Sequence, residues 1–207
     1  MVGADLSGIE LRMLAHYLAR YDGGRYAKLL LEDDIHQINA DKIGISRRQV
    51  KTVTYAFLYG AGDEKIGHSY DQQLSTTAAK KKGKEIRAAY VDAVDGLDDL
   101  LQAIKKAAER GFIKSIDGRK VNVDSPHKAL NYCLQSGAGV IAKRWMVINQ
   151  ETMREAQICA SQLGFIHDEL QFECAPEHVG DLSTSLVYSA TAAGEYYNMR
   201  IRIDAEA

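Results

Sequence analysis

Residues Leu163–Glu173 read Leu-Gly-Phe-Ile-His-Asp-Glu-Leu-Gln-Phe-Glu. Apolar residues flank three ionisable ones, His167, Asp168 and Glu169, and this pattern predicts a β-hairpin with charge at its tip. Because β-forming arms would hold the tip on a sheet, both carboxylates would be rigidly placed, as a metal site requires. A solvated turn explains the same residues, since Asp and Glu are common in turns and on surfaces.

The composition describes a globular chain with unevenly distributed charge. Its 207 residues, 46% of them hydrophobic, are enough to bury a core in one or two domains. The net charge of −2 argues against a protein that coats nucleic acid, because such domains usually carry a basic excess. Residues 47–87 nevertheless hold nine Lys and Arg against four Asp and Glu, a local charge of +5 that leaves −7 elsewhere. This division fits a polyanion on one face and metal-binding carboxylates on another, although a charged helix surface gives the same count.

The cysteines and the apolar runs indicate the kind of cellular compartment in which the chain works. Three cysteines without a C-x-x-C spacing predict neither a disulfide framework nor a zinc site, and they indicate a reducing compartment. No signal peptide and no apolar run long enough to span a bilayer is present. We therefore expect a cytoplasmic protein with no membrane partner.

The first residues predict a strand that delivers a carboxylate to its carboxyl end. Val2–Ala4 reads as the end of a buried strand, Asp5 follows it, and the residues after Asp5 open a helix over Ile9–Leu18. Asp5 is a candidate metal ligand and equally a candidate cap of that helix. Glu10 lies in the first turn, where the helix dipole favours an acid without any functional reason.

The clearest spacing in the chain follows Ser46, a good helix cap. Arg47, Lys51, Tyr55 and Tyr59 recur at steps of four and so form one slowly winding stripe on a helix. The cationic end suits a polyphosphate, and a base could stack on Tyr55. An exposed amphipathic helix with long, snorkelling cations explains the stripe as well.

The second half of the chain predicts further helices and strands. A hairpin is expected over 112–123 with Asp117-Gly118 as a two-residue turn, then a helix from about 125 to 157, a helix over 177–193 and a closing strand over 197–204. Asn131 and Gln135 lie one turn apart on the long helix, and such amides can read minor-groove acceptors, although solvated amides are common. Gly137 and Gly139 on this helix permit close approach of another backbone.

Three motifs together resemble those of the polymerase I-like, family A DNA polymerases. These are Asp5–Arg12, the Arg47–Gly60 stripe and His167–Glu169, in the family's order. Phe57–Gly67 and Asp117–Val121 are similar to the replicative polymerases of T-odd-type phages within that family. The resemblance covers nearly the whole chain and implies work in the cytoplasm, that of the host cell if the source is viral.

The resemblance implies an α+β fold in which an antiparallel palm sheet carries packed helices and a mostly helical fingers insertion. The expected division is palm over 1–21, fingers over 22–110 and the second part of the palm over 111–207. Asp5 and Asp168, helped by the Leu6 carbonyl, would hold two Mg²⁺ ions, for which Mn²⁺ can substitute, with Glu169 as an auxiliary acid. Two cations neutralise both the attacking 3′-oxygen and the leaving pyrophosphate in phosphoryl transfer.

The same resemblance assigns binding roles to further residues. The dNTP is expected to contact the first motif, the triphosphate-binding cations and the stacking aromatic: Ser7, Gly8, Ile9, Glu10, His36, Arg47, Lys51 and Tyr55. Glu10 with Tyr55 would close the space at the 2′ position and so exclude ribonucleotides. The DNA primer-template is expected to contact five residues, largely without reading sequence: Tyr59, Arg119, Asn131, Gln135 and His167.

The chain also departs from the resemblance. Only Met1–Ala4 precede the first motif, the segment between Gly67 and Ile116 is shorter than in the phage group, and the chain stops at Ala207 before an aromatic C-terminal tail. We therefore expect a palm and fingers fragment, or one piece of a split enzyme, that polymerises poorly alone. Its further partners would be the missing thumb and exonuclease domains or a processivity factor.

Three other functions compete with this reading. A single-subunit RNA polymerase shares the lysine helix, but that family has a different residue after His-Asp and lacks Glu10, so DNA synthesis is favoured. A catalytically incompetent nucleotide- or DNA-binding fragment would keep the carboxylates, and metal-dependent primer extension separates it from an enzyme. A carboxylate-metal hydrolase would need no triphosphate stripe, and pyrophosphate release from dNTP and primer discriminates it.

Overall fold

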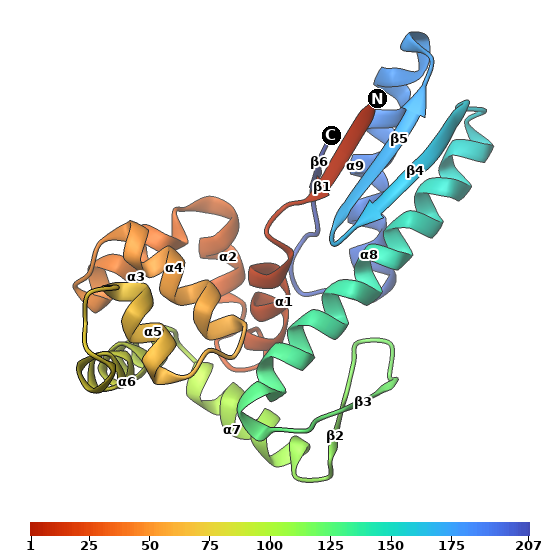
Figure 1. Ribbon diagram of the computed structural model, residues 1–207. Helices are drawn as coiled ribbons and strands as arrows, with labels where there is room; N and C mark the ends of the chain where they lie inside the picture. The colour runs from red at the N-terminus through yellow and green to blue at the C-terminus, as the bar shows by residue number, and fades with distance from the viewer.

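The structure is a computed structural model that describes residues 1–207, and it combines a small antiparallel sheet with many helices (Figure 1). The helices are α1 (Ile9–Leu18), α2 (Arg25–Glu32), α3 (Ile35–Ile43), α4 (Arg47–Leu58), α5 (Asp63–Tyr70), α6 (Thr76–Ala93), α7 (Leu97–Ala108), α8 (Ala129–Glu155) and α9 (Val179–Tyr196). The strands are β1 (Val2–Leu6), β2 (Phe112–Lys114), β3 (Lys120–Asn122), β4 (Ala160–Ile166), β5 (Glu169–Cys174) and β6 (Ala205–Glu206). The expected α+β class is confirmed.

The main sheet has the strand order β4-β5-β1-β6, with antiparallel neighbours throughout. Alternate residues of β1 and β5, such as Leu6, Leu170 and Phe172, are buried in the core that α8 and α9 also line. Trp145 of α8 is fully buried, and its indole N–H donates to the Leu186 carbonyl of α9 at 2.8 Å. One face of the sheet is therefore covered by helices, and the other stays open.

Helices α2 to α6 gather in a lobe on one side, α1 lies between this lobe and the sheet, and the long α8 runs from beside the lobe along the sheet (Figure 1). Helices α5 and α6 cross with their backbones in contact. A Cβ added at Gly83 would lie 1.7 Å from the Asp63 carbonyl oxygen, and one at Gly67 would lie 2.0 Å from the Ala79 carbonyl oxygen. Only glycine permits this crossing, which sets the position of α5 just after the α4 stripe.

Two expected elements differ from the structure. The β2–β3 loop has five residues, 115–119, rather than two; within it the Ser115 N–H bonds the Arg119 carbonyl at 3.0 Å, and Gly118 takes a left-handed φ of 83°. The strand expected over 197–204 is absent, and pairing with β1 is limited to β6. Ile201 and Ile203 are buried as alternation predicts, but this segment bonds largely to side chains of other elements instead of a strand.

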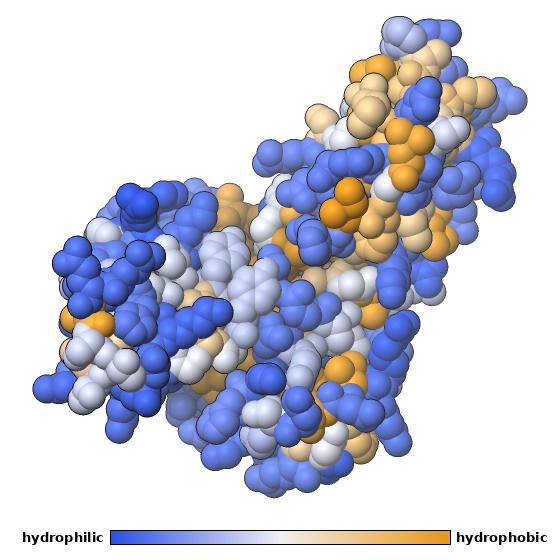
Figure 2. All heavy atoms as spheres, in the orientation of Figure 1, coloured by the Kyte–Doolittle hydropathy of each residue, from blue (hydrophilic) through white to orange (hydrophobic).

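The surface in Figure 2 is mainly hydrophilic over the helical lobe and mixed over the open face of the sheet. None of the helices has the length and apolar composition needed to cross a bilayer.

Candidate functional site

The tip of the β4–β5 hairpin lies against the end of β1. Ile166 pairs with Glu169, so His167 and Asp168 form a two-residue turn, as predicted, and His167 has a left-handed φ of 58°. The Leu6 N–H of β1 donates to the Asp168 carbonyl at 3.1 Å. The turn is thus held by the Ile166–Glu169 strand pair and by the Leu6 hydrogen bond, and together they fix Asp168 beside the end of β1.

Asp5 occupies the open face of the sheet, between two other acids. It is exposed while its neighbours Ala4 and Leu6 are buried, and it pairs across the sheet with Glu169 of β5 and Glu206 of β6. Asp5 and the hairpin that carries Asp168 therefore come from adjacent strands, although most of the sequence separates them.

The electrostatic environment of both Asp5 and Asp168 is unfavourable to negative charge. Burial raises the pKa of Asp5, and the charges of Asp168, Glu169, Glu206 and Glu10 raise it further. No cation contributes to the raised pKa of Asp5. A cluster of acids without a balancing cation favours the binding of a positive ion.

Burial also raises the pKa of Asp168, and repulsion from Glu10 and Glu169 adds to it. The backbone hydrogen bond of Asp168 and the nearby His167 act in the opposite direction. The two effects leave the carboxyl harder to ionise than an ordinary Asp.

The oxygen atoms present fit a hard divalent cation. Carboxylates and backbone carbonyls are the protein ligands that Mg²⁺ and Mn²⁺ prefer. In residues 1–207 no group of three or more His, Cys, Asp or Glu side chains is arranged to surround a metal. The Asp5 and Asp168 carboxylates lie close enough for their charges to repel, and Leu6 follows Asp5 at the end of β1.

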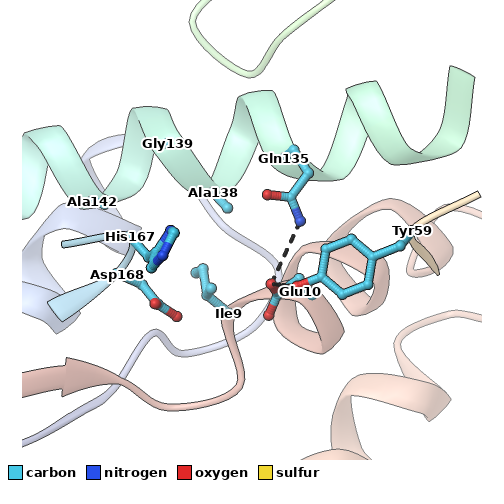
Figure 3. A pocket seen from close by; sticks show the side chains of 9 residues that line it. All are labelled: Ile9, Glu10, Tyr59, Gln135, Ala138, Gly139, Ala142, His167 and Asp168. Atoms are coloured by element: carbon cyan, nitrogen blue, oxygen red, sulfur yellow. Dashed lines mark hydrogen bonds between the residues drawn. The ribbon is translucent and has the colours of Figure 1, made fainter. Parts of the chain in front are cut away.

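A cavity of about 550 Å³ opens beside Asp168 and is bordered by Glu10, Tyr59 and Gln135 (Figure 3). The Tyr59 hydroxyl donates to Glu10 Oε1 at 2.7 Å, and Gln135 Nε2 approaches the same oxygen at 3.5 Å. The hydrogen bond to Glu10, followed by burial, raises the pKa of Tyr59 to about 12. Glu10 is thus held by Tyr59, and it also lies close enough to Tyr55, the partner implied by the family resemblance, for its charge to raise the pKa of Tyr55 after burial.

Small residues on α8 form the opposite wall of this cavity and were not predicted. Ala138, Gly139 and Ala142 line it, and a Cβ added at Gly139 would meet no atom within 4 Å. Gly137 instead faces Met13, whose Cε would lie 2.3 Å from an added Cβ, so the close neighbour is a side chain rather than a backbone. A run of small residues at helical spacing was the available signal for this wall.

The loop between β1 and α1 is clamped by Arg12, a residue to which the sequence analysis gave no role. Arg12 Nε donates to the Ser7 carbonyl at 2.6 Å, and its Nη1 contacts the Arg202 carbonyl and lies 3.2 Å from Asp204 Oδ2. The Ser7 N–H donates to the Asp204 carbonyl at 2.9 Å. The chain after Asp5 is therefore restrained from both sides.

The residues that follow Ser7 begin α1. Gly8 is the helix cap with a left-handed φ of 56°, and no side chain caps the helix, so Asp5 does not serve as that cap. Ile9 is buried and borders the cavity.

The stripe predicted on α4 is formed, with Ser46 and Gln49 making a capping box. Arg47 pairs with Asp34 at 2.6 Å, while Lys51 is exposed and has no ion-pair partner. Tyr55 is half-buried, and its ring centroid lies 6.2 Å from that of His36.

The His36 side chain is buried below this stripe, with Nδ1 lacking a hydrogen-bond partner. Burial lowers the pKa of His36, the Asp34 carboxylate partly opposes this, and the charges of Lys51 and Arg47 lower the pKa further. The four residues His36, Arg47, Lys51 and Tyr55 therefore lie on one surface of α3 and α4.

The amides and the arginine predicted to contact nucleic acid are engaged within the chain. Asn131 Nδ2 donates to the Leu58 carbonyl at the end of α4 at 3.3 Å, and Gln135 approaches Glu10. Arg119 is the last residue of the β2–β3 loop and pairs with Asp117 of the same loop at 2.5 Å. The structure brings His167, Gln135 and Tyr59 to the cavity but leaves Arg119 and Asn131 outside its lining.

The whole chain, residues 1–207, matches the sequence profile described as DNA polymerase family A. It is 35% identical to a DNA-directed DNA polymerase of Enterobacteria phage T3 and 34% identical to one of Escherichia phage T7, in each case over 99% of this chain and 31% of the relative. A DNA polymerase I of Mycobacterium tuberculosis is 29% identical over 85% of the chain and 21% of the relative. The chain thus spans about a third of the phage relatives.

Among solved structures, the chain is similar to the polymerase domain of Pol1 from M. smegmatis, in complex with DNA primer-template and dNTP. The TM-score is 0.79 at 23% identity, and the match covers 99% of this chain and 38% of that one. This likeness supports the fold.

Proposed function

The chain belongs to DNA polymerase family A, and on that premise we propose that it carries the nucleotidyl-transfer site of a template-directed DNA polymerase. The reaction would join a dNTP to a primer 3′-hydroxyl and release pyrophosphate. The observation that carries the proposal is that Asp5 on β1 lies close enough to Asp168, at the tip of the adjacent hairpin, for the two charges to repel, and that Asp168 lines the cavity that Glu10 borders. The reaction would take place in the cytoplasm.

Asp5, Asp168 and the Leu6 carbonyl would hold two Mg²⁺ ions, or Mn²⁺ in their place. When bound, such ions supply the positive charge that in-line phosphoryl transfer needs at the attacking and leaving oxygens. The chain's own contribution is a rigid placement of the two carboxylates, because β1 is paired on both sides and Leu6 is bonded to the hairpin tip. Glu169, which pairs with Asp5 in the sheet, would add negative charge nearby.

The α3–α4 surface would bind the triphosphate and base of the dNTP. Lys51 is exposed and without an ion-pair partner, and Arg47 would exchange Asp34 for a phosphate, since its guanidinium offers forked contacts to either group. His36, whose pKa is lowered, would contact phosphate as a neutral donor. Tyr55 would stack on the base, and the backbone of Ser7, Gly8 and Ile9 would line the nucleotide site.

Glu10 would form the wall that meets the 2′ position of the sugar. Tyr59 and Gln135 both direct hydrogen-bond donors at Glu10 Oε1, so its carboxylate is held across the cavity. A fixed, crowded wall excludes a 2′-hydroxyl by sterics. Tyr59, rather than Tyr55 alone, would therefore contribute to sugar selection.

The primer-template would cross the open face of the sheet and reach five residues: Tyr59, Arg119, Asn131, Gln135 and His167. Because Asn131 and Gln135 are engaged within the chain, their contacts to DNA would exchange for the present ones. In this proposal residues 1–21 and 111–207 form the palm and 22–110 the fingers. A thumb, an exonuclease domain or a processivity factor would be further partners.

Primer extension tests the proposal directly. With Mg²⁺, a primer-template and dNTP, the chain should release pyrophosphate in step with extension, and Asp168→Asn should abolish both. Asp181→Asn, which makes the same change at an exposed acid on α9, should change neither. Nucleotide and DNA binding without extension would identify a non-catalytic module, and preferential use of rNTP would identify an RNA polymerase.

Lys51→Ala tests the assignment of the triphosphate site. It should raise the dNTP concentration needed for half-maximal extension far more than it weakens DNA binding, because its proposed partner is the triphosphate. Arg48→Gln, on the same helix, is the matched control. Equal losses of dNTP use and DNA binding in Lys51→Ala would make it a general contact to the DNA backbone.

A further inference from the structure

A second cavity, of about 320 Å³, lies between α1, α7, β2 and α8, and no step of the proposed reaction uses it. Its interior is apolar and is formed by residues such as Ile104 of α7 and Ile113 of β2. Cys133 of α8 forms part of its base and points away from Gln135, because two residues turn a helix by roughly 200°. The cavity is therefore separate from the one that Glu10 borders.

Three cations stand at the rim of this cavity without a carboxylate to balance them. Arg20, Arg110 and Lys114 line it, no Asp or Glu does, and none of the three forms an ion pair in residues 1–207. Arg110, two residues past the end of α7, donates to the Ala107 carbonyl, and its guanidinium lies 5.3 Å from the centroid of the Phe112 ring. The mouth of an apolar cavity thus carries positive charge, in a chain whose net charge is negative.

The interior also holds a polar atom that lacks a good partner. The Tyr17 hydroxyl is buried with no hydrogen bond, and the group beside it is the Cys133 thiol, which is a weak acceptor. Because this hydroxyl is not exposed to the cavity, it offers the ligand no hydrogen bond, and the hydrocarbon part of a ligand can lie in the interior without covering it.

We propose that this cavity binds a small amphipathic carboxylate, with its hydrocarbon part between α1, α7 and α8 and its carboxylate at Arg20, Arg110 and Lys114. The volume lies at the lower end of the range of ligand pockets, so the ligand is small. An apolar body matches the interior, and a single negative charge matches the rim. A neutral apolar molecule of the same length leaves the cations unpaired.

Titration of the chain with decanoate, below its micelle concentration, tests the proposal by calorimetry. Decanoate should bind with one-to-one stoichiometry, and decanol should bind roughly tenfold more weakly because it lacks the charge. Arg20→Gln and Lys114→Gln should each weaken decanoate binding by roughly threefold, whereas Arg48→Gln, an exposed cation on α4, should not. Equal effects of the three variants, or equal affinity for decanol, would show non-specific adsorption and overturn the proposal.

Two further measurements place the ligand within the cavity. Ala107→Phe should abolish binding by filling the interior, and its melting temperature shows whether the variant folds. The reaction of the three free cysteines with a thiol reagent gives an independent readout on the unaltered chain. Decanoate should slow the labelling of Cys133, which lines the cavity, and leave that of the exposed Cys159 unchanged. Labelling of Cys133 at an unaltered rate under saturating decanoate would exclude this cavity.

Discussion

Replacing Arg12 by Met should loosen the loop that follows Asp5, because the apolar stem of the side chain stays while its charged head is lost. The head bonds the Ser7 carbonyl at 2.6 Å, the Arg202 carbonyl and the Asp204 carboxylate at 3.2 Å, and the side chain is only 12% exposed. A hydrogen bond to a charged group contributes about 1.5–3 kcal/mol, but the three share one donor group and are partly offset by its desolvation. We expect Arg12→Met to lower the free energy of unfolding by about 3 kcal/mol.

Urea denaturation measures this change, with an unaltered slope showing that the unfolded state is the same. The matched control is Arg202→Met, because the Arg202 side chain pairs with the same Asp204 carboxylate at 2.7 Å but is 61% exposed. An exposed pair contributes less than about 1 kcal/mol, so this variant should remain close to wild type. Equal losses in the two variants would refute the idea that Arg12 clamps the loop.

The same variant separates positioning from binding. The proposed metal-binding groups, Asp5 and the Leu6 carbonyl, immediately precede Ser7, so Arg12→Met should lower the rate of primer extension at least tenfold while the Kd for DNA changes little. Arg12→Lys keeps the charge but loses the forked geometry, and we expect it to restore stability more than rate. A Kd that rises as much as the rate falls would place Arg12 in DNA binding instead.

Three further predictions concern other parts of the chain. Gly83→Ala should lower the free energy of unfolding by about 3 kcal/mol, because its Cβ would meet a carbonyl of α5. The control Gly180→Ala, whose Cβ would meet nothing within 4 Å, should raise the free energy of unfolding by less than about 1 kcal/mol. Equal melting temperatures of the two variants would contradict the contact at the α5–α6 crossing. Burial and two nearby arginines lower the pKa of His16 to about 4, so unfolding takes up a proton between pH 6.5 and 4. The free energy of unfolding should therefore fall by up to about 3 kcal/mol as the pH is lowered from 6.5 to 4. His16→Gln keeps an acceptor without titrating, and urea denaturation against pH should show a flatter profile for it. Glu10→Ala should raise ribonucleotide incorporation roughly tenfold or more and slow dNTP incorporation, in single-nucleotide kinetics; unchanged sugar selectivity would remove Glu10 from the wall.

Elements with a local signal could be predicted from the sequence. The hairpin around Asp168 follows from alternation on both sides of a charged turn, and the α4 stripe from steps of four after a capping Ser46. Both signals lie within a dozen residues, so no distant contact is needed to form them. The α+β class followed from the same patterns and from the family resemblance.

Features that depend on how distant segments meet could not be predicted. Tyr55 and Tyr59 lie on one stripe, and only the position of the end of α4 relative to α1 decides that Tyr59 bonds Glu10. The segment 197–204 has the alternation of a strand, but its Arg200 N–H bonds a side chain, His16 Nδ1, at 3.1 Å. The alternation of apolar and polar residues predicts which side chains are buried, but it does not predict which groups the backbone bonds.

The strand order also determines when the strands of the main sheet can pair during translation. β1 is translated before the other strands of its sheet, and Val2 pairs with Phe172 and Asp5 with Glu206, so its partners emerge much later. Closing such large loops is slow, whereas helices between residues 25 and 108 find neighbours close in sequence. β1 therefore has no strand partner during most of the chain's translation, and its apolar side chains stay exposed. They would be a target for chaperones that bind exposed hydrophobic segments. The acidic site at the sheet does not exist until β5 has left the ribosome.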